Sequence, residues 1–235
     1  MTVDHQLPIP PGDRVPSREV PFPPHAPIKG SYAHLVPLHL DHTASLFKHI
    51  GGQDNATLWT FIPLEPPLIP PLTETDAEAL VRKWTASKDP QYYAVLDEKG
   101  EALGVLSYLN IVPTHRRIEI GWIVLGKALQ KTRVATDMFY LLMKRVFELG
   151  YQRVEWKANS LNKPSLAAAE RLGFTYEGLF RKHVISSGVR RDTSWFSITD
   201  DEWSGAQKGF EAWLDEGNFD QEGKQKRGLR ECREE

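Results

Sequence analysis

Residues 121–157 read GWIVLGKALQKTRVATDMFYLLMKRVFELGYQRVEWK, and this stretch decides the fold. It starts as an apolar strand, passes through a polar loop into a long amphipathic segment, and ends in a second strand pattern. Apolar residues recur at helical spacing over 133–149, and Gly150 stands where such a helix would end. A strand, a crossover helix and another strand form a βαβ unit, so we expect the two strands to be parallel.

The segments on either side of this unit predict a mixed sheet. Upstream lie a strand in YAHLVPL, two helices with Asp41 and either Thr73 or Thr75 as expected N-caps, a hairpin around EKGE and the strand RRIEIGWIVL. Downstream lie a short helix in KPSLAAAERLG, a hairpin around SSGVR and a possible terminal helix. Antiparallel hairpins with one parallel crossover are typical of the α+β class, and they exclude a repeating βα barrel or a doubly wound parallel sheet.

Composition divides the chain into a central domain and two tails. Residues 1–29 are rich in proline, which lacks an amide donor and fixes φ, so we expect an arm that is either disordered or wrapped over the surface as extended chain. Residues 30–216 form the expected folded domain. Residues 217–235 are charged and nearly free of large apolar side chains, and we expect them to be disordered or a frayed helix.

Charge and cysteine content exclude several classes of protein. The 235 residues carry a formal net charge of −2, whereas a general nucleic-acid binder needs a basic excess. The single cysteine, Cys232, allows no internal disulfide, and no apolar run approaches the ~20 residues that cross a membrane. The first residues lack a secretory pattern, and no His or Cys spacing fits a metal site. We expect a cytoplasmic protein with no nucleic-acid partner, no membrane partner and no metal.

The loop that starts the long helix is the first candidate site. Residues 130–137 join a strand to a helix, and the first backbone N–H groups of a helix have no partner within it. The helix dipole adds partial positive charge there, and Lys131 and Arg133 add full charges, so the loop could hold a pyrophosphate without glycine. Every βαβ unit has such a junction, however, and a packing role alone fits the loop equally well.

Several strings around this loop resemble the GNAT acyltransferase superfamily, in its branch similar to ribosomal-protein N-terminal acetyltransferases. The family's pyrophosphate loop has Gln or Arg, two variable residues, Gly, one variable residue and Gly or Ala; this chain has QKTRVA at 130–135, with Arg133 at the middle glycine position. The string NSLNKPSLAAAERLGFTYEG at 159–178 resembles the branch's Asn…Ser…Leu-Gly-Phe…Glu-Gly signature, and RIEIGWIVL resembles its Glu-Ile-Gly-Tyr strand. The resemblance covers about residues 30–200.

This resemblance implies a GNAT-like fold, with a mixed, mostly antiparallel sheet and a V-shaped splay between two parallel central strands, here 121–125 and 153–158. It also implies acetyl-CoA as co-substrate, with the pantetheine arm paired to the first of these strands and the pyrophosphate on the loop amides. With helical φ, Arg133 would donate its N–H and add a phosphate contact. The cofactor-binding residues that the resemblance implies are Ile123, Val124, Leu125, Gln130, Lys131, Thr132, Arg133, Val134, Ala135, Thr136, Asn159 and Asn162.

The implied reaction is direct transfer of an acetyl group to a primary amine in a ternary complex, and Glu119 is the candidate base. Strict strand alternation puts Glu119 on the face opposite Trp122, and a carboxylate in a partly apolar cleft has a raised pKa and can take a proton. The other interpretation is a solvent-facing Glu119 paired with Arg116 or Arg117. A strand N–H near residues 123–124 would polarise the carbonyl.

The leaving thiolate also needs a proton donor. Many GNAT enzymes use a tyrosine, but that position is Ala169 here, so the resemblance makes Ser165 the candidate acid, with Tyr176 or water as substitutes. A serine at this place often only caps a helix. His183 and Asp192 lie on the final hairpin near the family's acceptor end, and a lone histidine is more often a surface or packed residue than a base.

The acceptor is expected to be a small amine or a protein N-terminus, on an enzyme that is a monomer or a homodimer. The proline-rich segment FIPLEPPLIPP is expected to shape the acceptor mouth, with a subset of Trp59, Trp84, Tyr92, Tyr93 and Tyr108 lining it. Two alternatives remain open. One is a regulatory protein that binds CoA with weak or no turnover; the other is an adaptor that uses residues 1–30 as an extended ligand.

Overall fold

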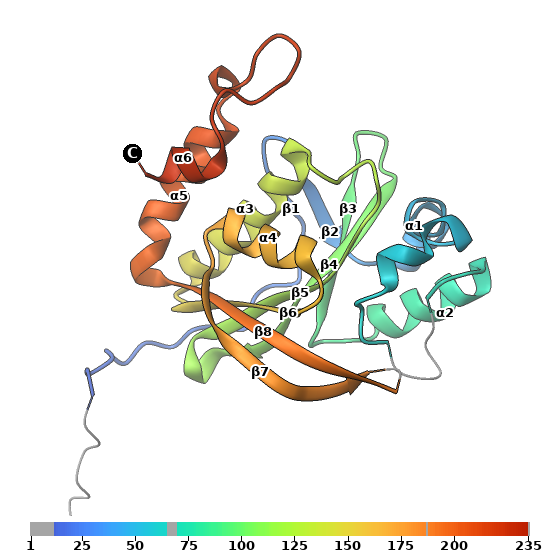
Figure 1. Ribbon diagram of the computed structural model, residues 1–235, viewed down its shortest axis with the longest axis horizontal. Coiled ribbons are helices and arrows are strands. Elements are labelled where there is room, and N and C mark those ends of the chain that lie inside the picture. Colours follow the sequence, from blue (N-terminus) through green and yellow to red (C-terminus); the bar gives the residue numbers. More distant parts are fainter. Residues whose placement is uncertain (1–11, 65–69, 187, 235) are drawn as a thin grey trace, which may run out of the picture.

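The computed structural model describes residues 12–64, 70–186 and 188–234 (Figure 1). Its strands are β1 (Ile28–Lys29), β2 (His34–Pro37), β3 (Gln91–Leu96), β4 (Ala102–Val112), β5 (Arg117–Leu125), β6 (Arg153–Asn159), β7 (Thr175–Ser186) and β8 (Val189–Thr199). They form one sheet in the order β1-β2-β3-β4-β5-β6-β8-β7. Only the β5–β6 pair is parallel within these ranges, so the expected mixed, mostly antiparallel sheet is confirmed.

Helices cover both faces of this sheet (Figure 1). They are α1 (Thr43–Ile50), α2 (Glu74–Thr85), α3 (Arg133–Leu149), α4 (Lys163–Leu172), α5 (Asp200–Leu214) and α6 (Leu229–Arg233). Alternate residues of β3 point to opposite faces: Tyr93 packs in the core with α3, α4 and α5, whereas Tyr92 packs with α1 and α2. None of the helices in the described ranges is long and apolar enough to cross a membrane.

The two parallel strands separate soon after they meet. β5 and β6 pair only at Arg117↔Arg153, Ile118↔Val154 and Glu119↔Glu155. Beyond these pairs β5 stays bonded to β4 as far as Leu125, and β6 stays bonded to β8 as far as Asn159. Each strand follows its outer neighbour, so the V-shaped splay between the two central strands is confirmed.

A β-bulge lies in β5 at the start of the splay. Trp122 has a positive φ of 50°, and the register between β4 and β5 shifts between Val105 and Ser107. The extra residue reverses the alternation of side chains beyond it. Trp122 therefore lines the same cavity as Glu119, and the sequence-based placement of the two on opposite faces was wrong.

The described part of the N-terminal arm lies along the surface as extended chain. Val20 is buried in the main core, and the backbone carbonyl of Pro23 accepts a hydrogen bond of 2.9 Å from the Gln91 side chain. Further carbonyls of the arm accept hydrogen bonds from Arg116, Arg145 and Tyr151. Proline removes donors but not acceptors, so the wrapped form that the sequence left open is the one observed for residues 12–27. Residues 1–11 lie outside the described part.

The charged C-terminal segment, which was expected to be disordered or a frayed helix, is described over residues 217–234 and contains the short helix α6. Leu229 and Cys232 are buried, at 2% and 5% exposure, against the side of α5. A Cβ added to Gly209 of α5 would lie 2.2 Å from Cγ of Arg233, so only glycine lets α6 pack this closely. The segment itself has few apolar side chains, and the sequence did not predict that α5 supplies the surface on which they pack.

The first two helices begin at different kinds of residue. Asp41 lies within a 3-10 turn at Leu40–His42, and α1 follows it without a side-chain cap, so the expectation that Asp41 caps the helix was wrong. Thr73 is the N-cap of α2 and forms a capping box with Asp76. Thr73, rather than Thr75, therefore starts this helix.

Asp137 links the start of α3 to the chain before β2. The side chain is 2% exposed, and its Oδ2 accepts hydrogen bonds from the backbone amides of Tyr32 (2.7 Å) and Ala33 (2.9 Å). We expect Asp137→Ala to lower the free energy of unfolding by about 2–4 kcal/mol, because two amides in a largely buried site lose their acceptor.

Urea unfolding followed by tryptophan fluorescence measures this loss. Glu148→Ala, an exposed change on the same helix, is the control and should alter stability by no more than about 0.5 kcal/mol. Equal stabilities of the Asp137→Ala and Glu148→Ala variants would contradict this role for the carboxylate.

Candidate active site

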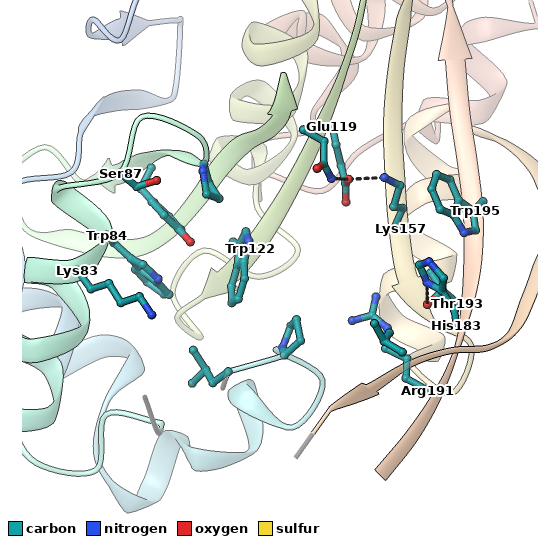
Figure 2. Close-up of a pocket in the computed structure, with 16 residues that line it drawn as sticks. Lys83, Trp84, Ser87, Glu119, Trp122, Lys157, His183, Arg191, Thr193 and Trp195 are labelled. Carbon is teal, nitrogen blue, oxygen red and sulfur yellow. Dashed lines mark hydrogen bonds and ion pairs between the residues drawn. The ribbon is translucent and has the colours of Figure 1, made fainter. Parts of the chain in front are cut away.

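A cleft of about 700 Å³ lies where β5 and β6 separate (Figure 2). One wall comes from α2, β3 and β5, and the opposite wall comes from β6 and the β7–β8 hairpin. Pro63 and Leu64 of the proline-rich segment also line it, whereas residues 65–69 of that segment lie outside the described part. The other lining residues are Lys83, Trp84, Ser87, Pro90, Tyr92, Asn110, Glu119, Trp122, Lys157, His183, Val184, Arg191, Thr193 and Trp195.

Glu119 is a buried carboxylate at the inner end of this cleft. It is 5% exposed, and its Oε2 lies 2.7 Å from Nζ of Lys157 and accepts a hydrogen bond of 2.6 Å from Asn110. Nζ of Lys157 also lies 3.2 Å from Glu155, which is the register partner of Glu119. Figure 2 shows Lys157 directed at Glu119 across the opening between the strands. The alternative of a solvent-facing Glu119 is therefore excluded.

Burial sets the acid–base character of Glu119. Removal from solvent raises the pKa of its carboxyl, while the Lys157 ammonium and the Asn110 amide pull that pKa down. A carboxylate with a raised pKa that is still held in its charged form by a nearby cation can accept a proton during a reaction.

Aromatic rings form much of the cleft wall. Trp84 stacks on Tyr92 with ring centroids 4.5 Å apart, and Trp122 meets Trp84 edge-on at 6.1 Å. On the opposite wall Nζ of Lys157 lies 4.0 Å from the ring centroid of Trp195, a cation–π contact that helps to hold the lysine. Of the aromatics expected here, Trp84 and Tyr92 line the cleft; Trp59 lies behind Trp84, and Tyr93 and Tyr108 are buried on the other face of the sheet.

The start of α3 leaves two amides open. Thr132 is the N-cap, and its Oγ1 accepts a hydrogen bond of 3.1 Å from the amide of Ala135. The amides of Arg133 and Val134 donate to no group in the part of the chain that the structure describes. The residue of this loop with a positive φ, 61°, is Lys131. Arg133 is the first residue of α3 and has no positive φ, so its position does not require the glycine found there in the family that the chain resembles.

The Arg133 side chain is held by the C-terminal segment. Its guanidinium carbon lies 3.4 Å from the ring centroid of Phe219 and 5.6 Å from that of Tyr32. The sequence did not predict this contact, because Phe219 belongs to the tail that was expected to be disordered or a frayed helix.

Comparison with known proteins gives the family. The profile of the acetyltransferase (GNAT) domain matches residues 33–175. The crystal structure of a GCN5-related N-acetyltransferase from Brucella melitensis is 37% identical and superposes with a TM-score of 0.88, covering 92% of this chain and 98% of that one. The chain belongs to the GNAT acetyltransferase family. Its resemblance to the ribosomal-protein branch is also supported, because 107 residues are 31% identical to the Bacillus subtilis protein named "Putative ribosomal N-acetyltransferase YdaF".

Other matches are partial or more distant. The alignment with YdaF covers 45% of this chain and 58% of that protein, and an alignment with the B. subtilis N-acetyltransferase YokL covers 40% of the latter. The microcin C7 self-immunity acetyltransferase MccE, solved with acetyl-CoA and AMP, shares the GNAT fold at 22% identity with a TM-score of 0.62, covering 76% of this chain and 98% of that one.

The structure of this GNAT protein places the remaining predicted residues as follows. Ile123, Val124 and Leu125 lie on β5 beyond its pairing with β6, and the Gln130 side chain donates 2.9 Å to the carbonyl of Leu125. Val134 and Ala135 pack against the core, and Thr136 is buried with its hydroxyl accepting from Arg171 at 3.1 Å. The side chains of Asn159 and Asn162 accept hydrogen bonds from the amides of Leu161 and Ser165.

The two candidate acids of this GNAT protein lie outside the residues that line the cleft. Oγ of Ser165 accepts a hydrogen bond of 3.1 Å from the indole of Trp156, and Tyr176 is 53% exposed on β7. His183 does line the cleft and lies 3.1 Å from the hydroxyl of Thr193. Asp192 accepts a hydrogen bond of 2.7 Å from the backbone of Lys182 and helps to shape the hairpin.

Among the residues that line the cleft of this GNAT protein, sequence reasoning missed Asn110, Lys157, Arg191 and Trp195. Lys157 could have been found, because it stands two residues after Glu155 on the same face of β6, and parallel pairing brings that face beside Glu119. The other three come from strands whose register was not predictable.

Proposed function

We propose that this protein is an acetyl-CoA-dependent N-acetyltransferase that moves the acetyl group to a primary amine by direct transfer in a ternary complex. The observation that carries the proposal is the opening between β5 and β6, which has Glu119 at its inner end and continues into an aromatic cleft. The open amides of Arg133 and Val134 lie at the end of the loop that follows β5. The thioester can therefore approach Glu119 through the opening between β5 and β6, while the amine approaches it through the aromatic cleft.

In this mechanism the donor lies along the free edge of β5, with its diphosphate on the amides at the start of α3. The amine nitrogen attacks the thioester carbonyl carbon, whose oxygen accepts a hydrogen bond from a β5 amide near Ile123 or Val124. Glu119 takes the proton that the nitrogen loses, directly or through water, and Lys157 stabilises the carboxylate before that transfer. The carbon–sulfur bond then breaks and the thiolate is protonated.

Ser165 is the preferred proton donor for this thiolate. An indole N–H can only donate, so Trp156 leaves the hydroxyl hydrogen of Ser165 free to be given away. Tyr176 and water are the other sources. The only cysteine of the sequence, Cys232, is buried in α6 among core residues outside the cleft, which supports direct transfer over an acetyl-cysteine intermediate.

Two measurements test the proposed function. Calorimetry with acetyl-CoA tests donor binding, and thiol release over a library of primary amines tests transfer. We expect intersecting initial-rate lines when both substrates are varied, as a ternary complex requires. Parallel lines would indicate a covalent intermediate, and failure to bind acetyl-CoA would contradict the proposal as a whole.

A second candidate is a regulatory protein that binds CoA with little or no turnover. The ion pair between Glu119 and Lys157 favours it, because a carboxylate tied to an ammonium is a weaker base. Binding of acetyl-CoA without thiol release for any amine would favour this candidate over the enzyme.

The pH dependence of the reaction reports on Glu119. Its raised pKa means that the carboxyl becomes protonated, and inactive as a base, as pH falls through that pKa, so kcat/KM should fall on the acid side. Lys157→Met removes a group that lowers this pKa, so we expect the acid limb of the profile to move to higher pH.

Lys208→Met, on the exposed side of α5, is the matched control and should leave the profile unchanged. An acid limb of Lys157→Met that stays in place, or that moves to lower pH, would show that Glu119 does not set it.

A further inference from the structure

Arg191 is a cation that faces the cleft and has no counter-ion among the described residues. It lies on β8 and lines the cleft, and Figure 2 shows its side chain reaching into the space between the β7–β8 hairpin and Trp122. Its Nε is buried and has no hydrogen-bond partner among the described residues, and no acidic group there lies in ion-pair distance of its guanidinium. Burial lowers the pKa of Arg191. A half-buried guanidinium of this kind is costly unless a bound anion compensates it.

The described lining of the cleft also carries more positive than negative charge. Lys83, Lys157 and Arg191 line it as cations, whereas Glu119 is the one acidic residue of the described lining. Lys157 is already shared between Glu119 and Glu155. A simple amine, which enters water-exposed sites as an ammonium, would meet one carboxylate and unneutralised positive charge. An acceptor that also carries an anion would remove this imbalance.

Resting on the proposed function, we propose that the acceptor is an amine that carries a carboxylate, as an α-amino acid does. Arg191 binds the carboxylate and the amino group lies towards Glu119. Glu119 and Arg191 line the same cleft, so one small zwitterion in it has both charges within the same space. The buried Nε1 of Trp195, which also lacks a partner among the described residues, is a second donor on this wall.

The shape of the cleft fits such an acceptor. Its volume of about 700 Å³ exceeds what a bare amino acid backbone needs, and Trp84, Tyr92 and Trp122 form the wall that a side chain would contact. A protein N-terminus lacks the α-carboxylate, because that group is bound in the first peptide bond, and so does not bring it to Arg191. The reaction itself is unchanged: the nitrogen–carbon bond forms, the carbon–sulfur bond breaks, Glu119 takes a proton from nitrogen and the thiolate receives one.

The experiment uses the full-length protein with acetyl-CoA and follows thiol release. The twenty protein amino acids are screened first, and each one that reacts is compared with its primary amide and its decarboxylated amine. An amidated peptide with a free N-terminus is run beside them. We expect at least one amino acid to react with a kcat/KM about 100-fold above that of its amide and its amine, because a charge-assisted hydrogen bond is lost in both.

The variant Arg191→Gln then locates the carboxylate. We expect it to raise KM for the amino acid about 100-fold, to leave KM for the amide nearly unchanged, and to leave the acetyl-CoA dissociation constant unaltered. Arg191→Lys should restore part of the loss. Arg190→Gln is the control, since that side chain is 62% exposed, lies 3.5 Å from Asp192 and does not line the cleft; its kinetics should match the parent.

Separate outcomes overturn the two proposals. Equal kcat/KM for an acid and its amide, no reaction with any amino acid while other amines or the peptide react, or an equal effect of Arg191→Gln on both acceptors would refute the carboxylate proposal and leave the acetyltransferase standing. Absence of acetyl-CoA binding would refute the proposed function itself.

Discussion

Glu119→Gln lowers kcat by about 100-fold or more while the acetyl-CoA dissociation constant stays the same. The amide has nearly the same shape as the carboxylate and can still accept a hydrogen bond from Asn110 or Lys157, so the cleft should keep its form. It cannot take a proton from the attacking amine. The loss therefore falls on the chemical step and not on donor binding, which occurs along β5 and at the start of α3.

The control for this variant is Glu155→Gln. Glu155 is buried and contacts the same lysine, Lys157, but it does not line the cleft. The Glu155→Gln variant should reduce kcat much less than Glu119→Gln, because it removes a charge near Lys157 without removing the base. Single-turnover rates at saturating amine are the measurement, and a parental rate for Glu119→Gln would remove Glu119 from the mechanism.

Gln130→Ala combined with Arg133→Glu is expected to weaken acetyl-CoA binding about tenfold or more. The new carboxylate stands at the first residue of α3, beside the open amides on which the diphosphate is proposed to lie. Like charges at that distance repel, and the helix N-terminus can no longer favour the anion fully. Calorimetric titration with acetyl-CoA gives the dissociation constants directly.

The contact of Arg133 with Phe219 requires a matched control. Gln130→Ala with Arg133→Gln removes the same stacked guanidinium but adds no negative charge, so any loosening of the C-terminal segment is common to both variants. The account requires the glutamate variant to bind acetyl-CoA more weakly than the glutamine variant. Equal dissociation constants for the two would place the diphosphate away from these amides.

Periodicity in the sequence was enough to predict the mixed sheet, its parallel crossover and the long helix Arg133–Leu149, because burial imposes these patterns on the strands and helices that form the core. The bulge at Trp122 could not be predicted, since one residue with positive φ reverses the alternation and leaves no mark in composition. The ordered tail was missed for a related reason: Gly209 and α5 create the surface that buries Leu229 and Cys232.

The candidate site was predictable only in part. Glu119 and the α3 loop follow from short strings near the centre of the fold, and the structure brings Glu119 into the cleft. Lys157 follows from the parallel pairing of β5 with β6, but Arg191 depends on which residues of β6 and β8 stand opposite one another, and that register is set by contacts distant in sequence. The balance of positive and negative side chains in the acceptor cleft could therefore be determined only from the three-dimensional structure.

A crystal structure with acetyl-CoA bound is the most direct test of the account. It should show the pantetheine chain in the opening between β5 and β6, beyond Glu119 and Glu155. The sulfur should lie at the border of the aromatic cleft, and phosphate oxygens should lie on the amides of Arg133 and Val134. Acetyl-CoA bound anywhere else, or an opening between β5 and β6 that remains empty at saturating acetyl-CoA, would contradict the account.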